Sequence, residues 1–209
     1  MQPTSFETLV DRARALSSSG RRLLGITGPP GAGKSLLASR LVEALRPHAA
    51  LVAMDGFHLD DVVLAGLGRG DRKGAPDTFD VDGYVALLRR VRSAEDDVVY
   101  APEFDRSLEA SRAAAIPVAR EVPLVITEGN YLLLDQPGWR DVRPLLDEVW
   151  YVCADEDVRL QRLVERHATY GKSHEDAIAW AHGSDQRNAE LVSRTRHLAD
   201  IEVRLPPRT

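Results

Sequence analysis

The hydrophobic residues of the chain follow two alternating spacings. Short apolar runs of β character predict strands at residues 22–27, 49–54, 121–127, 147–153 and 200–204. Apolar residues that recur every three or four positions predict helices at residues 5–18, 36–45, 81–91 and 158–167. Strands separated by helices are typical of a parallel sheet that helices cover on both faces. We therefore predict an α/β protein, a three-layer α/β/α sandwich with a mostly parallel sheet of about five strands.

Other segments depart from this alternation. Residues 66–78 are rich in Gly, Arg, Lys, Asp and Pro, which predicts a loop. Residues 98–100 and 116–118 are predicted to be short extended pieces, and the segment between them is polar. The charged stretch at residues 159–173 is predicted to form a small, mobile helical lid. Because no repeat or linker interrupts the sequence, we predict that residues 1–209 form a single domain.

Composition narrows the classes of function. The 27 Lys and Arg against 32 Asp and Glu give a net charge of -5, whereas proteins that bind nucleic acid or membrane surfaces carry a basic excess. No apolar run reaches the ~18 residues of a membrane span, and the amino terminus is too charged for a signal peptide. Cys153, the one cysteine, permits neither an intrachain disulfide nor a thiolate metal cluster. These features predict a cytoplasmic protein with no nucleic-acid and no membrane partner.

A glycine-rich motif of the form G-x-x-x-x-G-K-S connects the first predicted strand to the following helix. It comprises Gly28, Pro29, Pro30, Gly31, Ala32, Gly33, Lys34 and Ser35, with Leu36 next in the helix. The glycines let backbone N–H groups turn toward phosphate oxygens, and the helix adds the positive end of its dipole. Lys34 is predicted to reach the β- and γ-phosphates, and Ser35 to join a Mg²⁺ shell. The motif predicts a P-loop that binds ATP and Mg²⁺, against the alternative of a glycine-rich turn with a chance lysine.

Two carboxylates stand at the ends of predicted strands. Asp55 follows the strand at 49–54, and Glu128 follows the strand at 121–127. Because ligands of such sheets bind beyond the carboxyl ends of the strands, both acids are predicted to face the phosphates. Phosphoryl transfer needs one group that holds the metal and another that accepts a proton. The alternative is that each acid only starts a turn before the glycine that follows it.

Further motifs follow the P-loop in a set order. They are Met54-Asp55-Gly56-Phe57-His58, the run RKGAPDTFD at 72–80, Pro102-Glu103-Phe104-Asp105-Arg106 and Thr127-Glu128-Gly129. This set resembles the phosphoribulokinase/uridine kinase family, which includes bacterial pantothenate kinase. It looks closest to the small bacterial branch described as nucleoside/nucleotide kinase-like or fructose-transport kinase-like. The resemblance runs from Leu23 to Asn188 and implies ATP-dependent phosphorylation of a hydroxyl on a small-molecule acceptor.

The resemblance implies a role for five residues. Asp55 matches the carboxylate that activates the acceptor hydroxyl, and Asp77 matches an acid that binds sugar hydroxyls. Glu128 matches the acid on the metal side. Arg162 and Arg166 lie on a helix that resembles the lid, where guanidinium groups would neutralise charge on the transferred group and help exclude water.

Four further residues are predicted to contact the acceptor, each with a structural alternative. His58 either hydrogen-bonds the acceptor or fills the turn after Asp55. Arg72 belongs to a basic cluster that either contacts an anion or forms a solvated face. Asn188 either faces the substrate or caps a helix. Arg106 either pairs with a carboxylate or phosphate on the acceptor, or forms a salt bridge with a neighbouring acid, Asp105 or Glu103.

The nature of the acceptor is predicted from departures from the family. In uridine kinases, the segment that matches residues 102–112 supplies an aromatic hydroxyl and a histidine that read the pyrimidine ring. Here the matching residues are Phe104 and Glu109. Phe104 donates no hydrogen bond, and an unpaired polar edge on a buried base costs about 1–3 kcal/mol per missing partner. We therefore predict a sugar such as fructose, with a uridine-like nucleoside or pantothenate as the alternative.

Two rival functions remain at this point. A GTP-hydrolysing switch is suggested by the D-x-x-G pattern at residues 135–138, but the pattern recurs at 80–83 and the sequence has no N-K-x-D or T-K-x-D motif. A P-loop protein that binds nucleotide without turnover is disfavoured because Lys34, Ser35 and both strand-end acids are present. The sequence is compatible with a homodimer and does not fix the oligomeric state.

Overall fold

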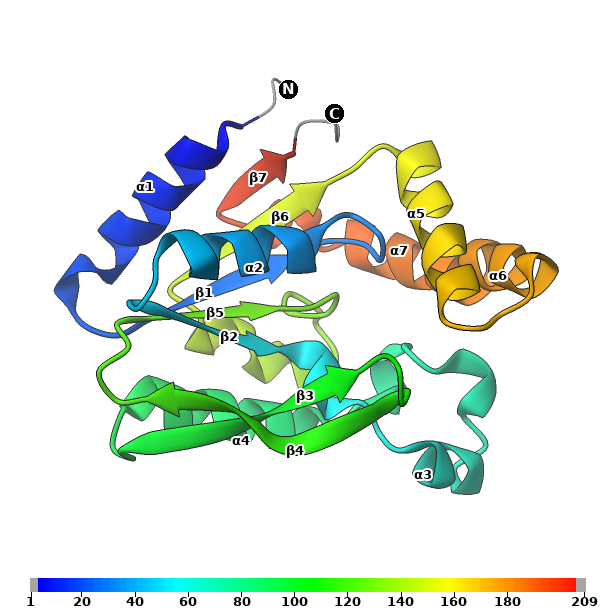
Figure 1. Cartoon of the computed structure of the whole chain (residues 1–209), viewed down its shortest axis with the longest axis horizontal. Helices are drawn as coiled ribbons and strands as arrows, with labels where there is room; N and C mark the ends of the chain where they lie inside the picture. The colour runs from blue at the N-terminus through cyan, green and yellow to red at the C-terminus, as the bar shows by residue number, and fades with distance from the viewer. Residues whose placement is uncertain (1–3, 206–209) are drawn as a thin grey trace.

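The structure is a computed structural model that describes residues 4–205, and it is built around a five-stranded parallel sheet with strand order β2-β5-β1-β6-β7 (Figure 1). Its strands are β1 (Arg22–Thr27), β2 (Ala49–Ala53), β5 (Leu124–Glu128), β6 (Glu148–Cys153) and β7 (Ile201–Arg204). β1 pairs in parallel with both β5 and β6. The prediction of a mostly parallel sheet is therefore confirmed.

Helices cover both faces of this sheet, as predicted. They are α1 (Phe6–Leu16), α2 (Lys34–Ala44), α3 (Asp61–Gly66), α4 (Val81–Ser93), α5 (Glu156–Thr169), α6 (His174–Trp180) and α7 (Gln186–Ser193). Successive β1 residues point to opposite faces, so Leu24 packs with α1 and α2 while Leu23 packs with α4. Both faces of β1 and β5 are thus buried, which explains why these strands are continuous apolar runs.

The largest difference from the predicted elements is a long antiparallel ribbon. β3 (Val98–Asp105) and β4 (Ala110–Ala119) pair along most of their length, where the sequence predicts only short pieces at their outer ends. Val99 and Val118 are buried against the core, whereas the middle of β4 is exposed. Backbone hydrogen bonds and polar side chains hold the exposed part of the ribbon, so no hydrophobic pattern marks it.

The predicted loop and lid also have more structure than expected. The short helix α3 precedes the loop, and it has no amphipathic signal because Val62 is 81% exposed. The loop itself contains two 3-10 turns, Gly70–Arg72 and Pro76–Thr78. Beyond α5, the chain continues through α6 into a π-helical segment, Ala181–Asp185, so the predicted lid is part of a longer helical unit.

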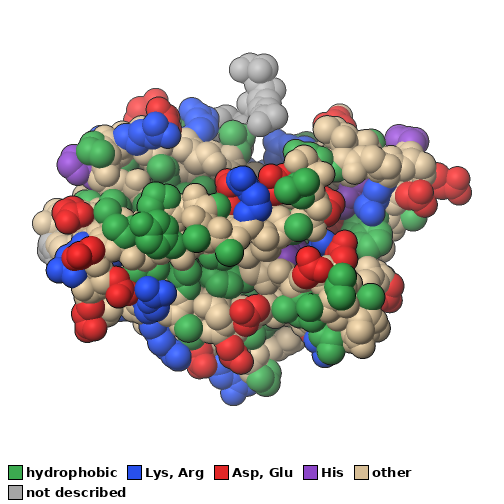
Figure 2. Space-filling view, turned by 60° about the horizontal axis from the view of Figure 1, so that its bottom comes forward, with side chains coloured by type: hydrophobic (Ala, Val, Ile, Leu, Met, Phe, Trp, Pro, Cys, Tyr) green, Lys and Arg blue, Asp and Glu red, His purple; other side chains and the backbone are tan. Residues whose placement is uncertain are grey.

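The side chains on the surface and the length of the helices relate to the prediction of no nucleic-acid and no membrane partner. On the face shown in Figure 2, acidic, basic and apolar side chains are intermixed. None of the helices within residues 4–205 is both long and apolar enough to span a bilayer.

Gly28 offers a test of how tightly the P-loop packs on the sheet. Its φ is +145°, and a Cβ there would lie 2.6 Å from the backbone oxygen of Val152 in β6. We expect Gly28→Ala to lower the free energy of unfolding by about 1–3 kcal/mol, measured by urea denaturation. Gly66→Ala is the matched control, because a Cβ there meets no atom within 4 Å, and its stability should be unchanged. Equal stability of the two variants would contradict the close packing.

Candidate active site

A cavity of about 710 Å³ opens beyond the carboxyl ends of β1, β2 and β5, a size typical of small-molecule sites. The P-loop, α3, the turn of the β3–β4 ribbon, α5 and the π-helical segment all contribute to its wall. In Figure 1 the helices α5 and α6 lie on the same side of the molecule as α3. The topology therefore brings together segments that are far apart in the sequence.

The P-loop has the backbone that its glycines predict. Gly31 and Gly33 adopt positive φ values of +80° and +101°, and α2 begins immediately afterwards at Lys34. The Lys34 side chain is buried, and its Nζ donates to the backbone oxygen of Pro29 at 3.1 Å. The predicted nucleotide-binding residues that line the cavity are Pro30, Gly31, Gly33, Lys34, Ser35 and Leu36. Gly28, Pro29 and Ala32 belong to the same loop without lining the cavity.

The two strand-end acids lie in the cavity wall, as predicted. Glu128 is 5% exposed, and its Oε1 accepts a hydrogen bond from the Ser35 hydroxyl at 2.9 Å. Burial and the charge of Asp55 raise the pKa of Glu128, although Lys34 and the Ser35 hydrogen bond oppose this. The structure thus joins Ser35 and Glu128, the predicted metal ligands, across 93 residues of sequence.

Asp55 has a different electrostatic environment. Burial alone would raise its pKa, but His58, Arg106, Lys34 and Arg166 outweigh it and hold the pKa of this carboxyl below its usual value. Asp55 is therefore charged at neutral pH. An ionised carboxylate at this position is able to accept a proton from a hydroxyl group.

Arg106 forms no salt bridge with the two neighbouring acids that the sequence suggested, Asp105 and Glu103. Its Nη2 donates to Asp55 Oδ2 at 3.0 Å. Glu103 and Asp105 instead form salt bridges with Arg112, at 2.6 Å and 3.5 Å. The expected alternative, a pair with Asp105 or Glu103, is therefore wrong. The ribbon turns Arg106 inward, toward a carboxylate 51 residues earlier in the chain.

The helix α5 places two arginines over the P-loop. Arg162 and Arg166 both line the cavity, and Arg162 Nη1 lies 3.5 Å from the backbone oxygen of Gly31. Arg159, one turn earlier, is 3% exposed and donates to the backbone oxygen of Pro30 at 3.4 Å. Arg159 thus fixes the start of α5 against the P-loop.

The acceptor side of the cavity is lined by aromatic rings. The His58 ring lies 4.1 Å from Phe79 and 4.7 Å from Phe104, measured between ring centroids. Burial lowers the pKa of His58, and the charge of Asp55 opposes this shift. Its Nδ1 donates to the backbone oxygen of Asp55 at 2.8 Å, so His58 fills the turn and lines the cavity at once.

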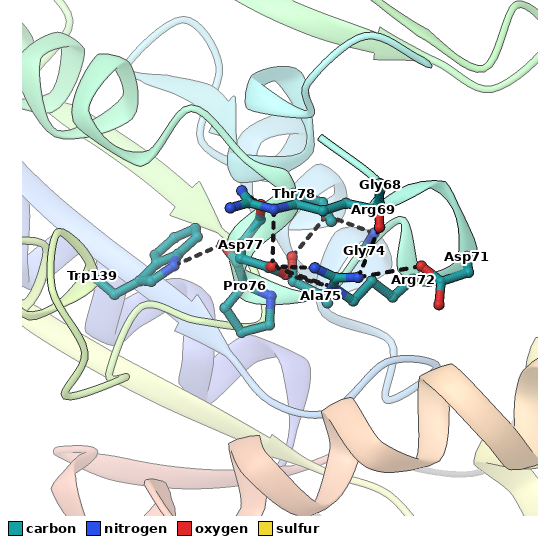
Figure 3. A network of polar contacts seen from close by, with 10 residues as sticks. All are labelled: Gly68, Arg69, Asp71, Arg72, Gly74, Ala75, Pro76, Asp77, Thr78 and Trp139. Carbon is teal, nitrogen blue, oxygen red and sulfur yellow. Dashed lines mark hydrogen bonds and ion pairs between the residues drawn. The ribbon is translucent and has the colours of Figure 1, made fainter. Parts of the chain in front are cut away.

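Arg72 and Asp77, both predicted to bind the acceptor, bind each other instead. Arg72 Nη2 lies 2.9 Å from Asp77 Oδ2, and Arg69 Nη1 donates to the backbone oxygen of Asp77 at 2.7 Å. Figure 3 shows this network around the turn at Pro76–Thr78. Neither Arg72 nor Asp77 lines the cavity, so their placement gives no support to the predicted contact. Arg72 and Asp77 are only five residues apart, so their opposite charges pair readily in such a turn.

Asn188 lines the cavity as predicted, and it also has a structural contact. Its Nδ2 donates to the backbone oxygen of Gly74 at 3.3 Å, and the Tyr131 hydroxyl donates to the same oxygen at 2.5 Å. Asn188 therefore ties α7 to the loop that borders the acceptor side. It does not cap a helix, the alternative that the sequence offered.

Several cavity residues form pairs that the sequence analysis did not predict. His167 Nε2 pairs with Asp185 Oδ2 at 2.7 Å, which connects α5 to the π-helical segment. Lys73 Nζ binds Asp61 Oδ1 at 2.6 Å and the backbone oxygen of Glu109 at 2.7 Å, so it ties α3 to the ribbon turn. No local pattern marks these pairs, although π-helical insertions are frequent at functional sites.

The depressed pKa of Lys34 predicts a pH dependence of ATP binding. Burial outweighs the charges of Glu128 and Asp55 and lowers the pKa of Lys34 to about 8. Bound phosphates favour the charged amine, so binding above this pH must take up a proton. We expect the Kd for ATP to rise by up to about tenfold per pH unit above about pH 8 in wild type. Calorimetry in buffers of different ionisation enthalpy measures the proton uptake. A pH-independent Kd, or the same slope in Lys34→Met, would contradict this account.

Comparisons with known proteins agree with the fold and the motifs. The family model described as Phosphoribulokinase / Uridine kinase family matches residues 23–208. The crystal structure of a protein described as a putative fructose transport system kinase from Silicibacter sp. TM1040 has a TM-score of 0.85 and 36% identity, over 95% of this chain and 98% of that one.

Two curated relatives are described as kinases of other acceptors. A putative uridine kinase of Schizosaccharomyces pombe is 32% identical over 213 residues, which cover 95% of this chain and 89% of the relative. A pantothenate kinase of Halalkalibacterium halodurans is 26% identical over 215 residues, which cover 96% of this chain and 64% of the relative. The family match spans most of the sequence and includes the P-loop, both strand-end acids and the α5 arginines. The chain therefore belongs to the phosphoribulokinase/uridine kinase family of P-loop kinases.

Proposed function

We propose that this kinase transfers the γ-phosphoryl group of ATP to a hydroxyl group of a sugar such as fructose. The observation that carries the proposal is the position of the Asp55 carboxylate, which lies in the wall of the cavity that also holds Lys34 and the P-loop and contacts Arg106 at 3.0 Å. A hydroxyl bound between Asp55 and the γ-phosphate gives its proton to the carboxylate. Its oxygen bonds to the γ-phosphorus, the bond to the β–γ bridging oxygen breaks, and ADP leaves.

The residues around Asp55 supply positioning and charge. The P-loop and Lys34 hold the β- and γ-phosphates, and Arg162 and Arg166 approach from α5. Both arginines offset the negative charge that spreads over the transferred group, and α5 shields the reaction from water. Positioning and electrostatics of this kind account for most of the catalysis in phosphoryl transfer.

The oxygens of Ser35 and Glu128 fit Mg²⁺. Magnesium prefers oxygen ligands and is usually bound by one or two carboxylates together with substrate phosphates and water. The Ser35 hydroxyl and a Glu128 oxygen already lie 2.9 Å apart beside the P-loop. Within residues 4–205 no group of three or more His, Cys, Asp or Glu side chains forms a metal site of its own. Bound there, Mg²⁺ supplies positive charge to the β- and γ-phosphate oxygens.

The acceptor side supports a sugar over a pyrimidine base. The rings of Phe104, His58 and Phe79 line this side together with charged residues such as Lys73 and Glu109, and Phe104 has no group that hydrogen-bonds a base. Aromatic rings beside the Asp55 carboxylate suit an acceptor with hydroxyl groups and an apolar ring face. The similarity to a fructose transport system kinase supports the same class, while the uridine and pantothenate kinase relatives define the alternatives.

A GTP-dependent switch finds no support in the geometry. Asp135, the acid of one D-x-x-G pattern, is 83% exposed at its side chain and pairs with Arg140. Asp80, the acid of the other pattern, caps α4 by accepting from Gly83. Neither acid lines the cavity that holds the P-loop.

A panel of acceptors tests the proposal. The protein is incubated with ATP, Mg²⁺ and one candidate at a time (fructose and other sugars, uridine, cytidine or pantothenate), and ADP formation is compared with a control that lacks acceptor. We expect a sugar to give the highest kcat/KM. A pyrimidine nucleoside or pantothenate as the best acceptor, with sugars inert, would contradict the acceptor class while leaving the kinase chemistry intact.

A further inference from the structure

Two arginines from different elements line the cavity near Asp55. Arg106 comes from the turn of the β3–β4 ribbon, and Arg166 comes from α5. Arg106 lies 3.0 Å from the Asp55 carboxylate, and the charge of Asp55 also acts on Arg166. The two guanidinium groups are close enough that Arg106 adds to burial in lowering the pKa of Arg166. Like charges repel each other, and Asp55 carries one negative charge against the two positive charges, so a further anion bound by both groups would stabilise the arrangement.

Most hydrogen-bond donors of the two groups are unused within the described residues. The Arg166 side chain has no hydrogen bond or ion pair with residues 4–205. Arg106 uses only Nη2, in its bond to Asp55, and its Cζ lies 5.8 Å from the centre of the Phe104 ring. A guanidinium group has five N–H donors, so Arg106 is able to hold Asp55 and a second anion at the same time. The nearby acids Glu109 and Asp185 do not accept from these free donors, because neither has a hydrogen bond or ion pair with Arg106 or Arg166.

The location of the pair identifies the anion. Asp55 must lie next to the attacking hydroxyl, and the hydroxyl next to the γ-phosphorus, so a side chain in contact with Asp55 is also beside the transferred group. Lys34, which the P-loop directs at the β- and γ-phosphates, is an electrostatic neighbour of both Asp55 and Arg166. Guanidinium groups bind phosphate oxygens through paired, charge-assisted hydrogen bonds.

We propose that Arg106 and Arg166 together bind the γ-phosphoryl group above Asp55, which makes Arg106 a catalytic residue from the turn of the β3–β4 ribbon. The proposal rests on the proposed function, because it assumes that Asp55 faces the γ-phosphate. Arg106 then has two contacts, one that orients the Asp55 carboxylate and one that offsets charge on an equatorial oxygen of the transferred group. Lys34 from the P-loop and Arg162 and Arg166 from α5 are three cations around the phosphates. Arg106 is a fourth, and it comes from the acceptor side.

The experiment compares nucleotides with and without a γ-phosphate in the absence of acceptor. The Kd values of ADP and of a non-hydrolysable ATP analogue, each with Mg²⁺, are measured for wild type, Arg106→Gln and Arg166→Gln. We expect the preference for the analogue over ADP to fall by about tenfold or more in both variants, because each loses a charge-assisted contact to the γ-phosphate. The affinity for ADP should change little.

Arg112→Gln is the matched control. Arg112 lies on the same ribbon and loses the same charge, but its partners are Glu103 and Asp105 on the ribbon itself. Its preference for the analogue should equal that of wild type. A wild-type preference in Arg106→Gln would overturn the proposal, and so would an equal loss in Arg112→Gln.

A second variant guards against a folding defect. If Arg106→Gln melts well below wild type, Arg106→Lys replaces it, since it keeps the charge and loses the planar fork. We expect Arg106→Lys to lower the preference for the analogue by less than Arg166→Gln does, and an unchanged preference would overturn the proposal. Because these measurements need neither acceptor nor turnover, they also separate this proposal from the proposed function. Failure of every acceptor in the panel would count against the latter alone.

Discussion

Asp55→Asn is expected to lower kcat by about 10²–10⁴-fold while nucleotide binding is largely retained. The amide has the size and shape of the carboxylate, but it is not a proton acceptor for the attacking hydroxyl. The low pKa of Asp55 means that wild type carries the base in its ionised form at neutral pH. On the acid side, the kcat of wild type should therefore fall only as the pH is lowered through the depressed pKa of Asp55, and the variant should lack this acidic limb.

The measurement is steady-state kinetics with the best acceptor from the panel, together with a Kd for ATP. Asp135→Asn is the matched control, because Asp135 is exposed and pairs with Arg140 away from the cavity. Its kcat should equal that of wild type. If Asp55→Asn instead loses ATP affinity and keeps its turnover at saturation, Asp55 is a nucleotide or metal ligand and the assignment of the base is wrong.

Lys34→Ala is expected to lower turnover by about 10²-fold or more. The amine is buried beside the P-loop and within the electrostatic reach of Glu128 and Asp55. Its contact should strengthen as charge shifts during transfer, so the loss should appear in kcat as well as in the affinity for ATP.

Circular dichroism and thermal melting show whether the Lys34→Ala protein is folded, and its rates are then compared with those of wild type. Arg140→Ala removes an exposed cation far from the P-loop and serves as the control. Near-normal phosphorylation by a folded Lys34→Ala protein would contradict the account of the P-loop.

The parts of the site that the sequence predicts well are those encoded locally. The P-loop residues are contiguous, and their glycine spacing already specifies the backbone that the structure shows. Asp55 and Glu128 were predictable because the carboxyl ends of parallel strands meet at one edge of the sheet. The close contact of Ser35 with Glu128 follows from that topology, since β2 and β1 both pair with β5.

The parts that the sequence did not predict depend on contacts between distant segments. The Arg106–Asp55 pair requires the ribbon to extend beyond its apolar ends and then turn over the cavity. The pair of His167 and Asp185 requires a π-helical segment whose extra residue leaves no mark in the hydrophobic pattern. Asp77 differs for the opposite reason, because it forms a local salt bridge with Arg72, and the acceptor contact that the family resemblance implied stays a prediction.

The most direct test of the central claim is to follow the γ-phosphoryl group itself. The protein, ATP and the acceptor panel are incubated in ¹⁸O-labelled water, and the products are analysed by mass spectrometry. If a carbon-bound hydroxyl attacks the γ-phosphorus, an acceptor gains one phosphoryl group without solvent oxygen, and this product should form about 10²–10⁴-fold more slowly with Asp55→Asn. Formation of labelled inorganic phosphate alone, at the same rate with every acceptor and without any acceptor, would show that water is the attacking group and would contradict the account.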